Sequence, residues 1–160
     1  MLNNVLTHPR KVISVLHISP IEEDHRSLEQ VFRHTNWELH KAQGLSSATA
    51  ILKYVPVSVV LCECDLNPGN WKDLLQEISV FTVPPSLIVT SRLADDALWG
   101  EVLNLGGYDL LAKPFELAEV VHSVSLAWWH WSSRRALAAK TPAFVPASNP
   151  LQRSAAVGAS

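Results

Sequence analysis

The sequence predicts an α/β fold, a doubly wound five-stranded parallel sheet with helices on both faces. Short apolar runs alternate with amphipathic stretches five times between residues 11 and 131. Two of the apolar runs, residues 57–62 and 87–89, contain almost no polar side chain, which is typical of strands covered on both faces. Repeated strand–helix units are joined by right-handed crossovers, and they form a doubly wound sheet.

The predicted elements follow one another in strict alternation. Strands are predicted at the short apolar runs 12–18, 38–42, 58–63, 86–90 and 108–112. Helices are predicted at the amphipathic stretches that follow them, 21–34, 45–54, 71–80, 95–105 and 116–131. In the fourth helix, Leu98, Val102 and Leu105 recur at helical spacing and predict its core-facing side, and Gly106 supplies a C-terminal stop.

Length and composition indicate a globular protein and exclude several classes. The chain has 160 residues, of which 48% are hydrophobic and 18% charged, so it can bury a core and is not disordered throughout. Two cysteines are too few for a disulfide scaffold. No uncharged run reaches the roughly 18 residues of a membrane helix, and the first residues lack a secretion signal. We expect a cytoplasmic protein that does not contact a membrane.

Charge and proline content divide the chain into three segments. Residues 1–10 are predicted to be an N-terminal extension, 11–131 the domain, and 132–160 a disordered basic tail rich in Ala, Ser and Pro. The tail carries four basic residues and no acid, a net charge of +4, against −6 for residues 1–131. Pro142, Pro146 and Pro150 would break a helix. The alternative interpretation is a basic arm that binds nucleic acid, although four basic residues are few for a nucleic-acid-binding surface.

Polar side chains stand where the predicted strands end. Ser19 and Pro20 follow the first strand, Glu63 ends the third, Thr90 ends the fourth, and Lys113 follows the fifth. The carboxyl ends of parallel strands form the binding edge of a doubly wound sheet, so we expect an acid, a hydroxyl and a lysine to meet there. Such a group of side chains is suited to handling an anion.

Residues 11–131 resemble the receiver domain of bacterial response regulators, which has the CheY-like (flavodoxin-like) fold. The matching segments are 106–115 (GGYDLLAKPF), 59–63 (VVLCE) with a glycine at 69, and 87–92 (LIVTSR). In that family, an aspartate that ends the third strand accepts a phosphoryl group from a histidine kinase, and an acidic pair after the first strand helps to bind Mg²⁺. The resemblance implies that Thr90 and Lys113 are the equivalents of the residues that contact the phosphoryl group.

Glu63 departs from this pattern, because it stands at the phosphoacceptor position. Its extra methylene carries the carboxylate about 1.5 Å further along, and a misplacement of about 1 Å can slow an in-line transfer by roughly 100-fold. We interpret Glu63 as a permanent charge that pairs with Lys113. Two alternatives stay open: retained phosphoryl acceptance, and a solvated residue at the end of a strand.

The metal site expected of the family also looks incomplete. Ser19 and Pro20 replace its acidic pair, and with Glu22 they predict a capping box that starts the first helix. We therefore expect no cofactor and no Mg²⁺ site of the usual kind. Glu23, Asp24 and Asp65 remain as secondary metal candidates.

The resemblance also suggests how a signal would leave the domain. Leu110 stands at the equivalent of the aromatic residue that swings inward on activation in many receivers, and a leucine cannot make that movement. In receivers, the fourth helix, fifth strand and fifth helix form a common surface for dimers and partners. Apolar side chains that lie beside the predicted core faces there give the interface candidates Trp99, Leu103, His122, Leu126 and Trp129.

These observations predict a stand-alone receiver-like domain in two-component or phosphorelay signal transduction, an atypical receiver or pseudo-receiver that acts by protein–protein interaction. The expected partner is a sensor kinase or another regulator, and a homodimer through the common surface is a further expectation. We expect no enzyme activity, because no nucleophile–base pair or cofactor fingerprint is present. The alternatives are a phosphorylatable receiver with an unusual metal shell, a basic-tailed nucleic-acid-binding module and a small-molecule-binding flavodoxin-like protein.

Overall fold

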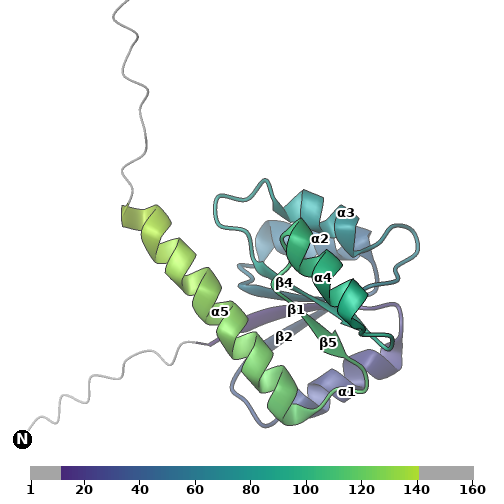
Figure 1. The fold of residues 1–160 in the computed structure, drawn as a ribbon. Coiled ribbons are helices and arrows are strands. Elements are labelled where there is room, and N and C mark those ends of the chain that lie inside the picture. The colour runs from purple at the N-terminus through teal and green to yellow at the C-terminus, as the bar shows by residue number, and fades with distance from the viewer. Residues whose placement is uncertain (1–11, 141–160) are drawn as a thin grey trace, which may run out of the picture.

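The computed structural model describes residues 12–140, in which one parallel sheet lies between two layers of helices (Figure 1). The elements in chain order are β1 (Ser14–Ile18), α1 (Glu22–Phe32), β2 (Glu38–Ala42), α2 (Leu45–Tyr54), β3 (Val59–Glu63), α3 (Trp71–Ile78), β4 (Ser86–Ser91), α4 (Asp96–Leu105), β5 (Asp109–Ala112) and α5 (Leu117–Lys140). The predicted alternation of five strands and five helices is confirmed.

The strand order β2-β1-β3-β4-β5 is that of a doubly wound sheet, and every neighbouring pair is parallel. β1 lies between β2 and β3, so the chain leaves β1 toward one edge of the sheet and later returns to build the other half. In the register, Ile18 lies opposite Cys62 and Glu63 lies opposite Thr90. The carboxyl ends of β1, β3, β4 and β5 therefore meet at one edge.

Two apolar clusters, one on each face of the sheet, explain why the central strands are almost continuously apolar. On β3, Val60 and Cys62 pack in the cluster shared with α2, α3 and α4, whereas Val59 and Leu61 pack in the cluster shared with α1 and α5. Successive side chains of a strand point to opposite faces, so a strand buried on both faces needs an apolar residue at every position.

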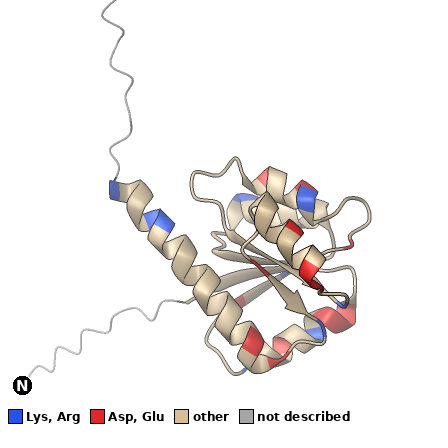
Figure 2. Ribbon diagram, in the orientation of Figure 1, with Lys and Arg blue, Asp and Glu red and all other residues tan. Residues whose placement is uncertain are grey.

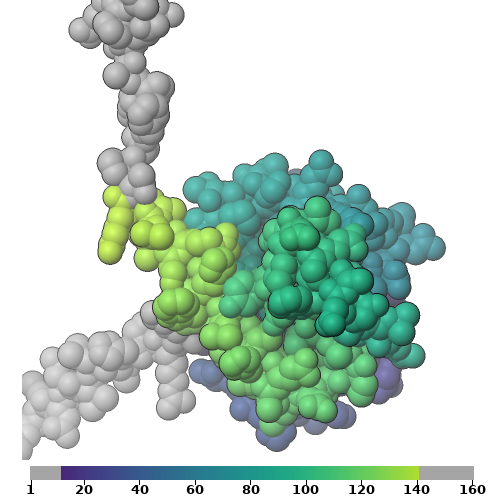
Figure 3. All heavy atoms as spheres, in the orientation of Figure 1, coloured from purple at the N-terminus to yellow at the C-terminus, as the bar shows by residue number. Residues whose placement is uncertain are grey.

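The last helix is longer than predicted. α5 continues through residues 132–140, so the prediction that a disordered tail begins at Ser132 is wrong for this stretch. Its Arg, Ala, Leu and Lys residues favour a helix, and the first proline of the tail, Pro142, stands beyond Lys140, the last residue that the structure describes. The last turns stand out to one side of the described surface (Figure 3). Residues 1–10 and the remainder of the predicted tail lie outside the described residues.

The distal part of α5 and the first turn of α1 carry opposite charges. Beyond Trp131, the charged residues of α5 are all Lys or Arg. The first turn of α1 instead holds the acids Glu22, Glu23 and Asp24 (Figure 2). Among residues 12–140, no helix is both long enough and apolar enough to span a membrane.

α4 ends as predicted but does not bury all of its apolar stripe. Gly106 caps the helix in the left-handed region with φ 104°, and Val102 is fully buried. Leu105, predicted to face the core, is 51% exposed. It occupies the last helical position, where the glycine turns the chain toward β5 and away from the layer that covers Val102.

Candidate functional site

The carboxyl edge of the sheet brings together the polar residues that were predicted to meet there. Glu63 ends β3 opposite Thr90 on β4, and both side chains are buried. Lys113 follows β5, and its backbone N–H donates to the carbonyl oxygen of Ser91 at 3.0 Å, which extends the pairing of β4 and β5 by one step. Ser19, at the end of β1, is fully buried beside them.

A buried ion-pair cluster forms the centre of the site. Lys113 Nζ lies 2.5 Å from Glu63 Oε2 and 2.8 Å from Asp24 Oδ2, and the three side chains are only 5–8% exposed. The expected contact between Glu63 and Lys113 is therefore present, and Asp24 is a second anionic partner that the sequence did not predict. Removing three charged groups from water is costly, and direct contact between opposite charges offsets that cost.

Lys113 and Asp24 hold each other in their charged forms. Burial alone would raise the pKa of Asp24, but hydrogen bonds from Lys113 and Ser19 outweigh it and hold the pKa below its ordinary value of 3.8. Burial would lower the pKa of Lys113, but hydrogen bonds to Asp24 and Glu63 outweigh it and raise the pKa above 10.5. The pair is thus fully ionised around neutral pH.

Ser19 positions Asp24 and does not cap a helix in the predicted way. Its hydroxyl donates to Asp24 Oδ2 at 2.7 Å and accepts from the backbone N–H of Ile21 at 3.1 Å. α1 begins at Glu22, and its N-cap residue, Ile21, makes no side-chain cap, so the predicted capping box of Ser19 and Glu22 is wrong. The later start places Asp24 in the first turn, from which it reaches into the site.

The oxygens of Glu63 are also held by neutral neighbours. Thr90 donates its hydroxyl to Glu63 Oε2 at 3.2 Å. The Cys64 thiol lies 3.7 Å from Glu63 Oε1 and 3.4 Å from the hydroxyl of Ser91. Thr90 and Lys113, which the resemblance predicts to be the equivalents of the phosphoryl-contacting residues, therefore both bind Glu63 itself.

The residues present do not fit the Mg²⁺ ion that the receiver resemblance implies. Mg²⁺ requires an octahedral shell of oxygens, but Asp24 and Glu63 each give an oxygen to Lys113, whose ammonium would repel a dication. Asp65 lies nearby, where its carboxylate, that of Glu63 and the thiol of Cys64 fall within 4.8 Å of one another. A thiol does not suit a hard cation. Glu23, the remaining metal candidate, is exposed on α1.

Two buried histidines lie next to the site, and their contact was not predicted. His25 Nε2 donates to the carbonyl oxygen of Ser19 at 2.9 Å, and His25 Nδ1 shares a hydrogen bond with His17 Nδ1, 2.8 Å away. Burial, followed by the neighbouring His25, lowers the pKa of His17 to about 3. One feature of the sequence indicated a buried histidine: His17 stands inside the apolar run of β1, where a side chain faces a covered side of the sheet.

The residues predicted to transmit a signal lie on the side of α4, β5 and α5. Leu110 is partly buried against the apolar cluster on the α4 side of the sheet. The five interface candidates are all exposed, and the four apolar ones range from 38% at Leu103 to 65% at Trp129. Trp128, by contrast, is partly buried against the other cluster. Whether a partner binds this surface stays a prediction.

Known structures share the fold. The chain is similar to the signal receiver domain of an HD domain-containing protein from Pseudomonas fluorescens Pf-5, at 25% identity and a TM-score of 0.72, over 83% of this chain and 98% of that chain. It is similar to the receiver domain of the Francisella response regulator 1452, at 18% identity and a TM-score of 0.66, over 74% of this chain and 98% of that chain. Neither a protein-family model nor a curated protein sequence matches the chain.

These likenesses establish a CheY-like receiver fold for the described residues and support a response-regulator-like signalling domain. Receiver domains are generally not enzymes. One similar structure, at 16% identity and a TM-score of 0.69, over 81% of this chain and 99% of that chain, is described as an adenylate cyclase from Rhodopirellula baltica.

Proposed function

We propose that this chain is a pseudo-receiver, a signalling module that acts by protein–protein contact and does not accept a phosphoryl group. The observation that carries the proposal is the position of Lys113 Nζ between Glu63 and Asp24. An ammonium bound to both carboxylates occupies the charge-balancing role that a dication has in a phosphorylatable receiver. The site is then satisfied internally, with neither metal nor phosphoryl group.

The chemistry of Glu63 supports the same proposal. Its Oε2 is bound by Lys113 and Thr90, and its Oε1 lies beside the Cys64 thiol, so both oxygens already have partners within the protein. An acyl phosphate at Glu63 would have to form without a fitted metal, and it would have to break the contact with Lys113. Both requirements raise the barrier to transfer.

Phosphorylation by a small donor tests the proposal directly. The full chain is incubated with acetyl phosphate and Mg²⁺ and examined by intact mass, beside Glu63→Asp and a Ser19→Asp/Pro20→Asp/Glu63→Asp variant that restores the family's acids. We expect no added phosphoryl group on the wild type or on Glu63→Asp. The triple variant shows whether restoring all three acids is sufficient. Stoichiometric, acid-labile phosphorylation of the wild type at Glu63 would overturn the proposal and favour a phosphorylatable receiver.

Partner binding is the second part of the proposed function. We propose that a sensor kinase or another regulator docks on the exposed side of α4 and α5, where Trp129 is 65% exposed. Tryptophan is a frequent anchor of protein interfaces. A pull-down from the native cell with wild type, Trp129→Ala and Lys113→Ala is expected to lose a partner with Trp129→Ala. Unchanged recovery with every variant would contradict this location.

A further inference from the structure

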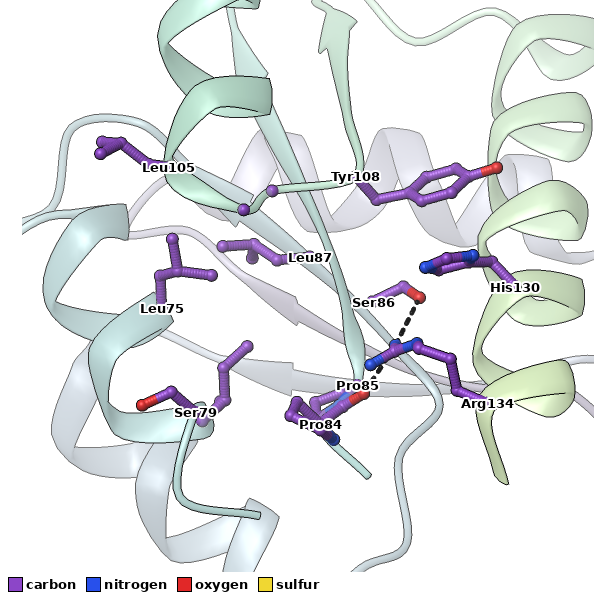
Figure 4. Close-up of a pocket in the computed structure, with 13 residues that line it drawn as sticks. Leu75, Ser79, Pro84, Pro85, Ser86, Leu87, Leu105, Tyr108, His130 and Arg134 are labelled. Atoms are coloured by element: carbon purple, nitrogen blue, oxygen red, sulfur yellow. Dashed lines mark hydrogen bonds between the residues drawn. The ribbon is translucent and has the colours of Figure 1, made fainter. Parts of the chain in front are cut away.

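A pocket opens at the end of the sheet opposite to the ion-pair cluster. It lies at the amino ends of β4 and β5, between the C-terminal end of α3, the C-terminal end of α4 and the distal half of α5, and has a volume of about 300 Å³ (Figure 4). Ser86, on its wall, and Thr90, in the first site, are four residues apart on β4, which is about 13 Å at the usual rise of a strand. The two sites are therefore separate.

Most of the pocket wall is apolar. Leu75 and Ile78 of α3, Leu87 of β4 and Leu105 of α4 line it from one side. Leu105, which is half-exposed although it belongs to the apolar stripe of α4, is one of the lining residues. A volume near 300 Å³ is at the small end of the range for ligand sites.

A single arginine gives the pocket its charge. Arg134 projects from α5, and its Nη2 donates to the carbonyl oxygen of Pro84 at 2.9 Å and to the hydroxyl of Ser86 at 3.3 Å (Figure 4). These bonds hold the guanidinium in place. The Nε–H is buried and has no partner among the described residues. None of the described residues that line the pocket is Asp or Glu, and no described carboxylate pairs with Arg134.

Among the described residues, Arg134 has no counter-ion. Burial lowers the pKa of Arg134 below its ordinary value, and no charged neighbour contributes to that change. The guanidinium stays charged in proteins and binds planar carboxylates through more than one N–H group. Next to it, the rings of Tyr108 and His130 lie with their centroids 5.3 Å apart and give the pocket an aromatic rim.

We propose that this pocket binds a small amphipathic monoanion, a carboxylic acid with a compact apolar body, whose carboxylate pairs with Arg134. The single cation of the pocket matches a ligand with one negative charge, and the leucine-rich wall matches a ligand with an apolar body. The part of α5 beyond Trp131 is required, because it supplies Arg134. This binding site goes beyond the proposed signalling function and does not depend on it.

The test uses phenylacetate as a probe, with the full ¹⁵N-labelled chain followed by two-dimensional NMR. We expect saturable shifts of the amides of Gly106, Gly107 and Tyr108, with an affinity on the order of millimolar for so small a ligand. Phenylacetamide, the neutral analogue, is expected to bind about tenfold more weakly or worse, because a charged hydrogen bond is lost. Inorganic phosphate alone is expected to leave these amides unshifted.

Variants test whether Arg134 is the residue that binds the carboxylate. Arg134→Gln is expected to weaken phenylacetate binding by about tenfold or more, whereas Arg135→Gln, which removes the same charge from the next position of α5, is expected to retain it. Leu105→Glu, at a half-exposed wall position that leaves Arg134 untouched, is expected to weaken binding, and Leu105→Gln to retain it. The proposal is overturned by an absence of saturable shifts, by equal binding of phenylacetate and phenylacetamide, by the same shifts with phosphate, or by full binding to both Arg134→Gln and Leu105→Glu.

Discussion

Lys113 Nζ lies 2.8 Å from Oδ2 of Asp24, a residue 89 positions earlier in the chain. This contact ties the end of β5 to the first turn of α1, and Lys113 also contacts Glu63 at the end of β3. Two buried carboxylates thus share one ammonium. Removal of the lysine, or protonation of Asp24, would break this shared contact, and the first two predictions follow from it.

Loss of the lysine is expected to be severe. Lys113→Met leaves Asp24 and Glu63 buried and facing each other without a cation, and breaking a buried pair in this way costs about 3–5 kcal/mol of the free energy of unfolding. Urea denaturation at pH 7 measures it. The control is Lys72→Met, whose lysine is exposed and pairs with exposed Glu101, and which should cost less than about 1 kcal/mol. Similar losses for the two variants would contradict a buried, essential pair.

Acid is expected to weaken the fold through Asp24. Its pKa is lower in the folded chain than in the unfolded chain, so the unfolded chain takes up the proton first as the pH falls. The stability from the pair is complete above about pH 4 and is lost as the pH falls through the folded pKa. Asp24→Asn should flatten this acid limb, and Glu23→Gln, an exposed neighbour on α1, should leave it in place. Chemical denaturation at a series of pH values measures both, and equal curves for the two variants would argue against the assignment.

His17 is expected to add a second acid dependence at higher pH. It is neutral and buried in the fold with a pKa of about 3, whereas an unfolded histidine titrates near 6.5. Between those values the unfolded chain binds the extra proton, so the free energy of unfolding falls by up to about 1.4 kcal/mol per pH unit as the pH drops. His17→Leu should show a shallower slope between pH 6 and pH 4 (roughly the middle of that window) than His34→Gln, whose histidine is exposed. If the two slopes coincide, His17 is not the group responsible.

Two glycines of α4 are expected to respond in opposite ways to the same substitution. Gly106 has φ 104°, and an added Cβ would meet no atom within 4 Å, so Gly106→Ala carries only a backbone cost of about 1–2 kcal/mol. Gly100 lies inside the helix, again with nothing within 4 Å, so Gly100→Ala should stabilise by about 0.5–1 kcal/mol. Thermal unfolding of the two variants provides the comparison, and a shift of the same sign in both would contradict the helix end described above.

The sheet was predictable because its signal is local. On β3, alternate residues fill the two apolar clusters, so the sequence from Val59 to Cys62 is apolar at every step. The approach of Glu63 and Lys113 followed from the same pattern, since both stand at carboxyl ends of strands in one parallel sheet. The α5 error came from giving the prolines of the tail too much weight, because the first of them stands beyond Lys140.

The rest of the site was not predictable because it depends on how α1 is placed. Asp24 reaches Lys113 only because the helix begins at Glu22 and Ser19 is free to bind the carboxylate. A capping box at Ser19 would have been locally just as reasonable, and nothing in the sequence decides between the two. The meeting of His17 with His25 requires the same placement, since one residue lies on β1 and the other on α1.

The strand order has a consequence for how copies of the molecule meet. β2 and β5 are the outer strands, and unpaired backbone groups at the rim of a sheet invite a strand from another chain. β5 is only four residues long, and β2 carries Glu38 and Lys41, the latter paired with Glu29 of α1. Short length and charged side chains both discourage edge-to-edge growth. Self-association of this domain should therefore proceed through side chains of its helices and not through continuation of its sheet, which protects a concentrated sample from β-type aggregation.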